Sequence, residues 1–221
     1  MKTNTDTQYK LVYIMDPLCG WCYGNAANII HTYETFREHI PFEIIPGGMW
    51  AGHNARMQSL QMAAYFRNHD QQIAAMTGTA FGEAYFEFIQ REDVLLNSEI
   101  PSRAIVTAQH LWPGISPEFM AAVQKARYYY GKDLNHYSTY EAILQQLNLD
   151  NDAFRQHFDS PAMKAATQAA FARAASYAMS YPTLLLETGN RTILIEQGYS
   201  SAEEIISNIA SHLTDIHHFI A

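Results

Sequence analysis

The stretch KLVYIMDPLCGWCYG, residues 10–24, decides the fold of this chain. Its first six residues are mostly apolar and strand-forming, and the Asp-Pro pair that follows ends the predicted strand because proline lacks an amide hydrogen for the ladder. From Gly20 onward, apolar residues recur at helical spacing to about residue 38. Cys19 and Cys22 therefore lie where a strand passes into a helix.

Strands are predicted again on either side of a long helical region. FEII at residues 42–45 predicts a second strand, which ends at Pro-Gly-Gly and completes a β-α-β unit with parallel strands. Residues 182–187 and 192–196 predict a hairpin. Ser200 with Glu203 then predicts the N-terminal cap of a final helix.

The intervening residues carry almost no strand signal. Helix starts are predicted there by Ser116-Pro117, by a capping box of Ser138 with Glu141, and by Ser160-Pro161. The expected fold class is therefore α/β. Residues 1–54 and 161–221 are expected to build one sheet-containing domain, and residues 55–160 an all-helical insertion domain.

The composition limits the partners that this chain can have. Of 221 residues, 48% are apolar and 16% charged, and 14 basic against 22 acidic residues give 14 − 22 = −8. No basic surplus is present to bind nucleic acid or an anionic membrane surface, and no apolar run reaches the roughly 18 residues of a membrane helix. Residues 1–10 lack the apolar core of a secretory signal, so we expect a cytoplasmic protein.

Both cysteines of the chain fall in one Cys-x-x-Cys motif. A bridge between them closes too short a loop to stabilise the fold much, so chemistry explains the pair better. A helix N-terminus favours the thiolate form of a cysteine, which is the nucleophile of disulfide exchange. Cys19 is predicted to be that nucleophile, partly exposed at the helix start, and Cys22, one turn further, to be the buried thiol that resolves the mixed disulfide.

Two other interpretations of the pair compete with redox chemistry. In the first, the cysteines are two of the four ligands of a zinc site, but the sequence offers only His212 with His217 as a second pair of suitable spacing. Alternatively, they are inert core residues, because free cysteine is among the most buried residue types. We expect no metal and favour the redox pair.

DPLCGWCYG resembles the active site of the DsbA-like branch of the thioredoxin superfamily with a CxWC motif. The segments PGGMWAG, SRA, QKARYYYGKDL and SYPTLLLE follow in the order found in that family, so the resemblance covers nearly the whole chain. It implies a thioredoxin-like fold with a large helical insertion and thiol-disulfide oxidoreductase activity. It also implies a cis bond between Tyr181 and Pro182, facing the cysteines, with Tyr181 offering backbone groups to an extended substrate.

Further roles follow for the neighbours of the pair. Trp21 offers an apolar face beside the reactive sulfur for a polypeptide or a glutathione moiety, and Met49 and Trp50 are expected to approach the site. Asp16 is either a solvated turn residue or, if buried, a group for proton transfer to or from Cys22. The expected substrate is a disulfide-containing protein or a small thiol or disulfide, with glutathione as candidate co-substrate and no other cofactor.

In a reducing cytosol the dithiol form dominates, which favours reductase or isomerase work. One rival function is that of a glutathione-dependent kappa-class transferase or isomerase, which shares this architecture but uses a serine in place of the cysteine pair. A second is a thioredoxin-like binding or chaperone module with a vestigial pair. No feature of the sequence indicates an oligomeric state.

Overall fold

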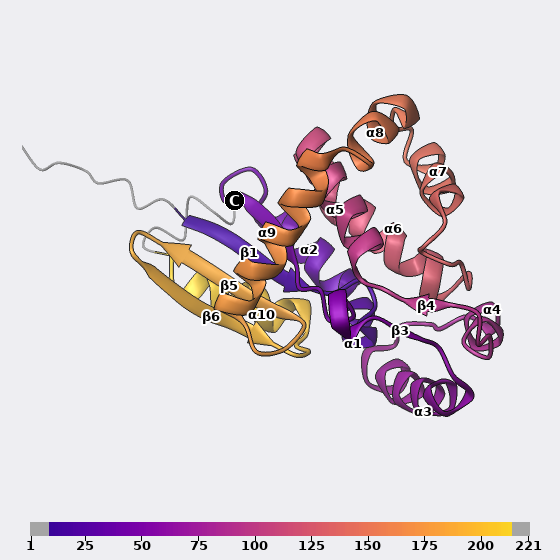
Figure 1. Cartoon of the computed structure of the whole chain (residues 1–221). Helices are drawn as coiled ribbons and strands as arrows, with labels where there is room; N and C mark the ends of the chain where they lie inside the picture. Colours follow the sequence, from indigo (N-terminus) through magenta and orange to yellow (C-terminus); the bar gives the residue numbers. More distant parts are fainter. Residues whose placement is uncertain (1–8, 214–221) are drawn as a thin grey trace, which may run out of the picture.

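The computed structural model describes residues 9–213, and a four-stranded sheet lies at one side of the molecule (Figure 1). Its strands are β1 (Tyr9–Met15), β2 (Phe42–Pro46), β5 (Thr183–Thr188) and β6 (Arg191–Gln197), in the order β2-β1-β5-β6. β1 and β2 run parallel, as expected of a β-α-β unit, whereas β5 is antiparallel to both β1 and β6. The predicted hairpin and the joining of distant strands in one sheet are confirmed.

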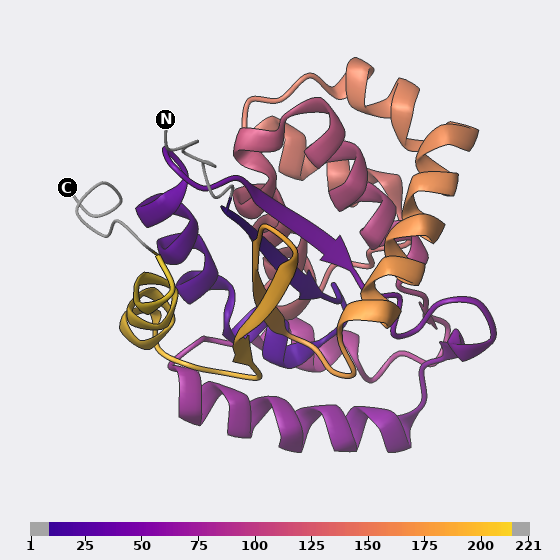
Figure 2. The ribbon, with the colours of Figure 1, turned by 90° about the vertical axis from the view of Figure 1, so that its left-hand side faces the viewer.

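Both faces of the sheet are covered by helices (Figure 2). Val12 and Ile14 of β1 pack with Ala174 of α9 (Pro161–Tyr177) on one face. Leu11 and Tyr13 belong to the larger core on the other face, which includes α2 (Ala26–Phe36) and α10 (Ala202–Ser211). Because successive residues of a strand point to opposite faces, the apolar run of β1 is buried on both sides.

A helical region stands beside the sheet and carries most of the remaining residues (Figure 1). Its helices are α3 (Leu60–Thr77), α4 (Glu83–Phe88), α5 (Glu99–Leu111), α6 (Ser116–Tyr128), α7 (Tyr137–Gln146) and α8 (Asn151–Phe158). Short 3-10 helices at Gly52–Asn54 and Pro113–Ile115 and a pair of two-residue strands, β3 (Arg56–Met57) and β4 (Leu95–Leu96), complete the region. These strands are too short for a period-two pattern, so the sequence predicted only helix here.

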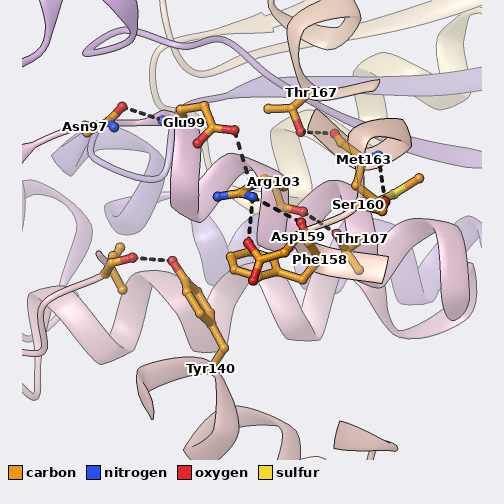
Figure 3. Close-up of polar contacts among 11 residues, drawn as sticks. Asn97, Glu99, Arg103, Thr107, Tyr140, Phe158, Asp159, Ser160, Met163 and Thr167 are labelled. Atoms are coloured by element: carbon orange, nitrogen blue, oxygen red, sulfur yellow. Dashed lines mark hydrogen bonds and ion pairs between the residues drawn. The ribbon is translucent and has the colours of Figure 1, made fainter. Parts of the chain in front are cut away.

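Arg103 of the SRA segment ties α5 to the junction of α8 and α9 (Figure 3). Its guanidinium donates to the carbonyl oxygen of Phe158 at 3.2 Å and to Asp159 at 3.0 Å, and it pairs with Glu99 at 3.2 Å. It also lies 4.4 Å from the centroid of the Phe158 ring. Because Arg103 is only 6% exposed, these partners hold a buried charge, and the segment has a structural role.

Two of the helix predictions are wrong and a third is confirmed. The helix expected from Gly20 to about residue 38 is two helices, α1 (Gly20–Gly24) and α2, which meet at Asn25. The predicted box of Ser138 with Glu141 does not form, because the N-cap of α7 is His136, two residues before Ser138. Ser160 does cap α9, where its side chain accepts from the amide of Met163.

The last helix is capped one residue later than predicted. Consecutive serines and consecutive glutamates let the Ser-x-x-Glu pattern fit two registers, and the structure uses Ser201 with Glu204. The amide of Ser200 instead donates to the buried Glu196 at 2.8 Å. The Ser200 amide is thus already bound by Glu196, which leaves Ser201 and Glu204 to form the capping box.

Candidate active site

The two cysteines differ in exposure as predicted. Cys19 is the N-cap residue of α1, with extended backbone angles, and is partly exposed, whereas Cys22 lies inside α1 and is 0% exposed. Both are free thiols. The backbone amide of Cys19 donates to the carbonyl oxygen of Asp16 at 3.1 Å, which fixes the turn from β1 into the helix.

Cys22 is held as a thiol by its surroundings. Burial raises its pKa well above the usual value, and the neighbouring Cys19 raises it further, because a second negative charge nearby is unfavourable. The backbone amide of Asp16 donates to Cys22 Sγ at 3.5 Å and partly opposes this rise. Cys22 therefore needs a proton acceptor before it can attack a mixed disulfide.

Asp16 is a turn residue, but it is fully buried rather than solvated. Its carboxylate accepts from the amides of Leu18 at 2.8 Å and Met49 at 2.6 Å and from the hydroxyl of Ser98 at 2.9 Å. Burial raises its pKa from 3.8 to about 6 in spite of these hydrogen bonds. Asp16 thus joins three distant loops and titrates close to neutral pH.

The Tyr181-Pro182 bond is cis and the segment faces the cysteines, as the resemblance implies. Cys19 Sγ donates to the carbonyl oxygen of Tyr181 at 3.7 Å, and the Tyr181 hydroxyl donates to the carbonyl oxygen of Gly47 at 3.0 Å. A Cβ on Gly47 would lie 2.1 Å from Tyr181 Cζ, so this glycine makes room for the ring.

Trp21 and Tyr181 line one open hollow of about 360 Å³ beside Cys19. Met76, Gly198 and Tyr199 line the same hollow, and Met76 is 62% exposed. The structure therefore brings together Cys19, Trp21 and the Tyr181-Pro182 segment, which the sequence separates by about 160 residues. This arrangement leaves an apolar surface next to the partly exposed thiol of Cys19.

A second, smaller cavity lies beside Cys19 and is lined by Trp50 together with residues for which no role was predicted. Leu18 and Gly20 form one wall, and Trp50, Asp70 and Arg127 belong to the others. Trp50 approaches the site as expected, and its amide donates to Ser98 at 3.0 Å. Asp70 and Arg127 come from α3 and α6, which both contact α1. Arg127 lies in the QKARYYYGKDL segment of the family resemblance, whereas no local pattern marks Asp70.

A buried glutamate lies at the joint between α1 and α2, and the local sequence pattern does not reveal it. Glu196 of β6 is 4% exposed and accepts from Asn25 Nδ2 at 2.9 Å, at the joint between α1 and α2. Burial raises its pKa from 4.5 to about 7. In a strand pattern a single glutamate predicts the solvent face, so only the tertiary structure identifies it as buried.

Within residues 9–213, no group of three or more His, Cys, Asp or Glu side chains is arranged to hold a metal ion. His217, one of the two histidines of the zinc alternative, lies outside the described residues. None of the described helices is long and apolar enough to cross a membrane.

Solved structures resemble this chain over nearly its whole length. A candidate protein disulfide isomerase from Nitrosomonas europaea superposes with a TM-score of 0.82 at 26% identity, covering 92% of this chain and 97% of its own. The cytosolic disulfide reductase DsbM from Pseudomonas aeruginosa gives 0.79 at 26% identity, with coverage of 91% and 97%.

The chain has a DsbA-like thioredoxin fold. The predicted fold class, a thioredoxin-like fold with a large helical insertion, is confirmed. A second DsbM structure, solved with GSH, matches with a TM-score of 0.74 at 24% identity over 91% of this chain and 98% of its own. No protein-family model and no curated protein matches the sequence.

Proposed function

We propose that this DsbA-like chain is a thiol-disulfide oxidoreductase that works as a reductase in the cytoplasm. One observation carries the proposal: an exposed thiol at a helix N-terminus, one turn from a buried thiol, in a fold shared with a cytosolic disulfide reductase. The thiolate is the reactive form of cysteine, and the first turn of a helix favours it. The vestigial-module and kappa-class alternatives do not account for two intact thiols in this arrangement.

The reaction begins when the Cys19 thiolate attacks one sulfur of the substrate disulfide. An S–S bond forms between Cys19 and that sulfur while the substrate bond breaks, and the other sulfur leaves as a thiolate that takes a proton from water. Cys22 then loses its proton, attacks Cys19 Sγ and expels the second substrate thiolate. The substrate gains two electrons, and the pair is left as a Cys19–Cys22 disulfide.

Glutathione is the proposed source of the electrons that return the pair to the dithiol. Two glutathione thiols supply them and leave as glutathione disulfide. A DsbM structure that contains GSH supports this choice. The cytosolic glutathione pool is reducing enough to hold most dithiols in reduced form. We assign substrate contacts to Trp21 and to the backbone of Tyr181 at Pro182, since these line the hollow beside Cys19.

Asp16 is the proposed acceptor of the Cys22 proton. It is buried beside Cys22, and its negative charge raises the pKa of Cys22. With a pKa of about 6, Asp16 is mostly ionised at neutral pH and can accept a proton. General bases contribute roughly 10²- to 10⁴-fold to a rate. Asp16→Asn should therefore lengthen the life of the mixed disulfide at neutral pH, which quenched-flow mass spectrometry measures. An unchanged lifetime would leave Asp16 with a structural role alone.

Insulin reduction with glutathione as electron donor tests the proposal. Wild type should reduce insulin, and Cys19→Ser should abolish the activity. Cys22→Ser should stop net reduction but trap the Cys19 mixed disulfide with substrate. A Cys22→Ser variant that still reshuffles scrambled disulfides while wild type reduces none would assign the chain as an isomerase. Equal activity of wild type and Cys19→Ser would refute the enzymatic proposal.

A further inference from the structure

The small cavity beside Cys19 contains a buried cation without a polar partner. Arg127 is 4% exposed, and its Nε makes no hydrogen bond within the part of the chain that the structure describes. No ion pair or side-chain hydrogen bond links Arg127 to any of residues 9–213, where its contacts are aromatic. A buried charge normally has a paired anion, because removing it from water is otherwise unfavourable.

The position of Arg127 connects it with the reactive thiol. Leu18 and Gly20, which flank Cys19, line the same cavity as Arg127. Tyr128, next to Arg127 in α6, lines this cavity as well. α6, which carries Arg127, packs against α1, which starts at Cys19 (Figure 1).

Asp70 supplies the opposite charge on another wall. It is 2% exposed, accepts from the Tyr85 hydroxyl at 2.5 Å and lies 3.3 Å from the ring of His69. Tyr85 lines the same cavity and touches both charges: its hydroxyl donates to Asp70, and the Arg127 guanidinium lies 5.9 Å from its ring centroid. The cavity thus offers a cation and an anion that do not neutralise each other directly.

We infer that this cavity binds the γ-glutamyl end of glutathione or its disulfide, with the carboxylate at Arg127 and the ammonium beside Asp70. The inference rests on the proposed function and names the specificity residue of that site. Arginine matches a carboxylate through two parallel N–H donors. A cavity of about 60 Å³ holds about four to six water-sized groups, as many as the heavy atoms of an amino-acid head group.

Steady-state reduction of two disulfides, with dithiothreitol as the electron donor, tests the inference, because reduction of glutathione disulfide by glutathione itself gives no net reaction. Glutathione disulfide carries the charged groups, whereas bis(2-hydroxyethyl) disulfide is neutral. Arg127→Met should lower the ratio of kcat/KM for glutathione disulfide over the neutral disulfide by roughly 10- to 100-fold, mainly through KM. Arg127→Lys should restore part of this preference for glutathione disulfide. The ratio stays informative even if a variant folds less well, because both substrates meet the same protein.

Arg91→Met is the matched control. Arg91 is exposed and lies over the Phe88 ring at 5.8 Å, where Arg127 lies at 5.3 Å, so the control removes the same charge from the same aromatic cluster. For Arg91→Met, the ratio of kcat/KM for glutathione disulfide over that for the neutral disulfide should match that of wild type. γ-Glutamylcysteine disulfide, which lacks the glycine, should keep the full dependence on Arg127, and loss of that dependence would overturn the γ-glutamyl assignment.

The outcomes distinguish a failure of this inference from a failure of the proposed function on which it rests. If no disulfide reacts with wild type, the proposed function fails. If both disulfides react and Arg127→Met lowers both equally, the oxidoreductase stands and the carboxylate site is refuted.

Discussion

Asp16→Asn should remove one contribution to the pH dependence of the free energy of unfolding. The pKa of Asp16 is about 6 in the folded chain against an ordinary 3.8, so the folded state binds more protons than the unfolded state between those values. Stability from this group is then fully present below about pH 4 and is lost as the pH rises through about 6. At 1.36 kcal/mol for each pKa unit, the difference of 2.2 corresponds to about 3 kcal/mol.

The asparagine carries no charge, so the loss of stability with rising pH disappears. Its NH₂ group, however, faces the backbone amide of Met49, which donates a hydrogen bond to the carboxylate in wild type. The donor left without an acceptor costs about 1–3 kcal/mol, and this cost is the same at every pH. The free energy of unfolding of Asp16→Asn minus that of wild type should therefore rise by about 3 kcal/mol between about pH 4 and pH 7.5, whatever its absolute value.

Urea denaturation of the reduced proteins across this pH range gives the measurement. Asp152→Asn, an exposed aspartate in the first turn of α8, shows what removal of one surface charge does. A difference between Asp16→Asn and wild type that stays flat with pH would refute the reasoning, because Asp16 would then have the same pKa in both states. A difference that falls with pH would mean that the carboxylate stabilises the fold.

Three further substitutions probe the surroundings of the pair. Gly20→Ala should destabilise by about 1–3 kcal/mol, because a Cβ there would lie 2.5 Å from Asp70 Oδ1, while Gly114→Ala, with its nearest neighbour at 4.0 Å, should leave the melting temperature unchanged. The free energy of unfolding of Glu196→Gln minus that of wild type should be higher above about pH 7 than near pH 5, because the buried carboxylate destabilises the fold once it is ionised; the acceptor that the amide lacks costs the same at both pH values, and denaturation at the two values would measure the difference. Tyr181→Phe should cost about 0.5–1.5 kcal/mol in thermal denaturation, since only its hydrogen bond to Gly47 is lost; a much larger loss would mean that the ring itself has moved.

Local sequence patterns were sufficient where one segment decides its own structure. The apolar run before Asp16 and the helix onset at Gly20 placed β1, α1 and both thiols correctly. They could not show that Asn25 divides the helix or that Ser201 rather than Ser200 caps α10. Asn25 and Ser200 each donate a hydrogen bond to Glu196, and a local pattern does not show these contacts. The cis bond before Pro182 came from the family resemblance, since a proline at a strand start looks the same in sequence whether its bond is cis or trans.

The residue between the cysteines illustrates why the rest of the site was out of reach. In sequence, Gly20 is one of two residues that a redox motif leaves variable. In the structure it has no room for a side chain, because Asp70 and Ile73 of α3 pack against it. The same close approach brings a buried carboxylate to the first turn of α1, where the backbone amides favour a negative charge. Asp70 thus packs against the first turn of α1, and α3, fifty residues away in the chain, limits which residue can stand between the cysteines.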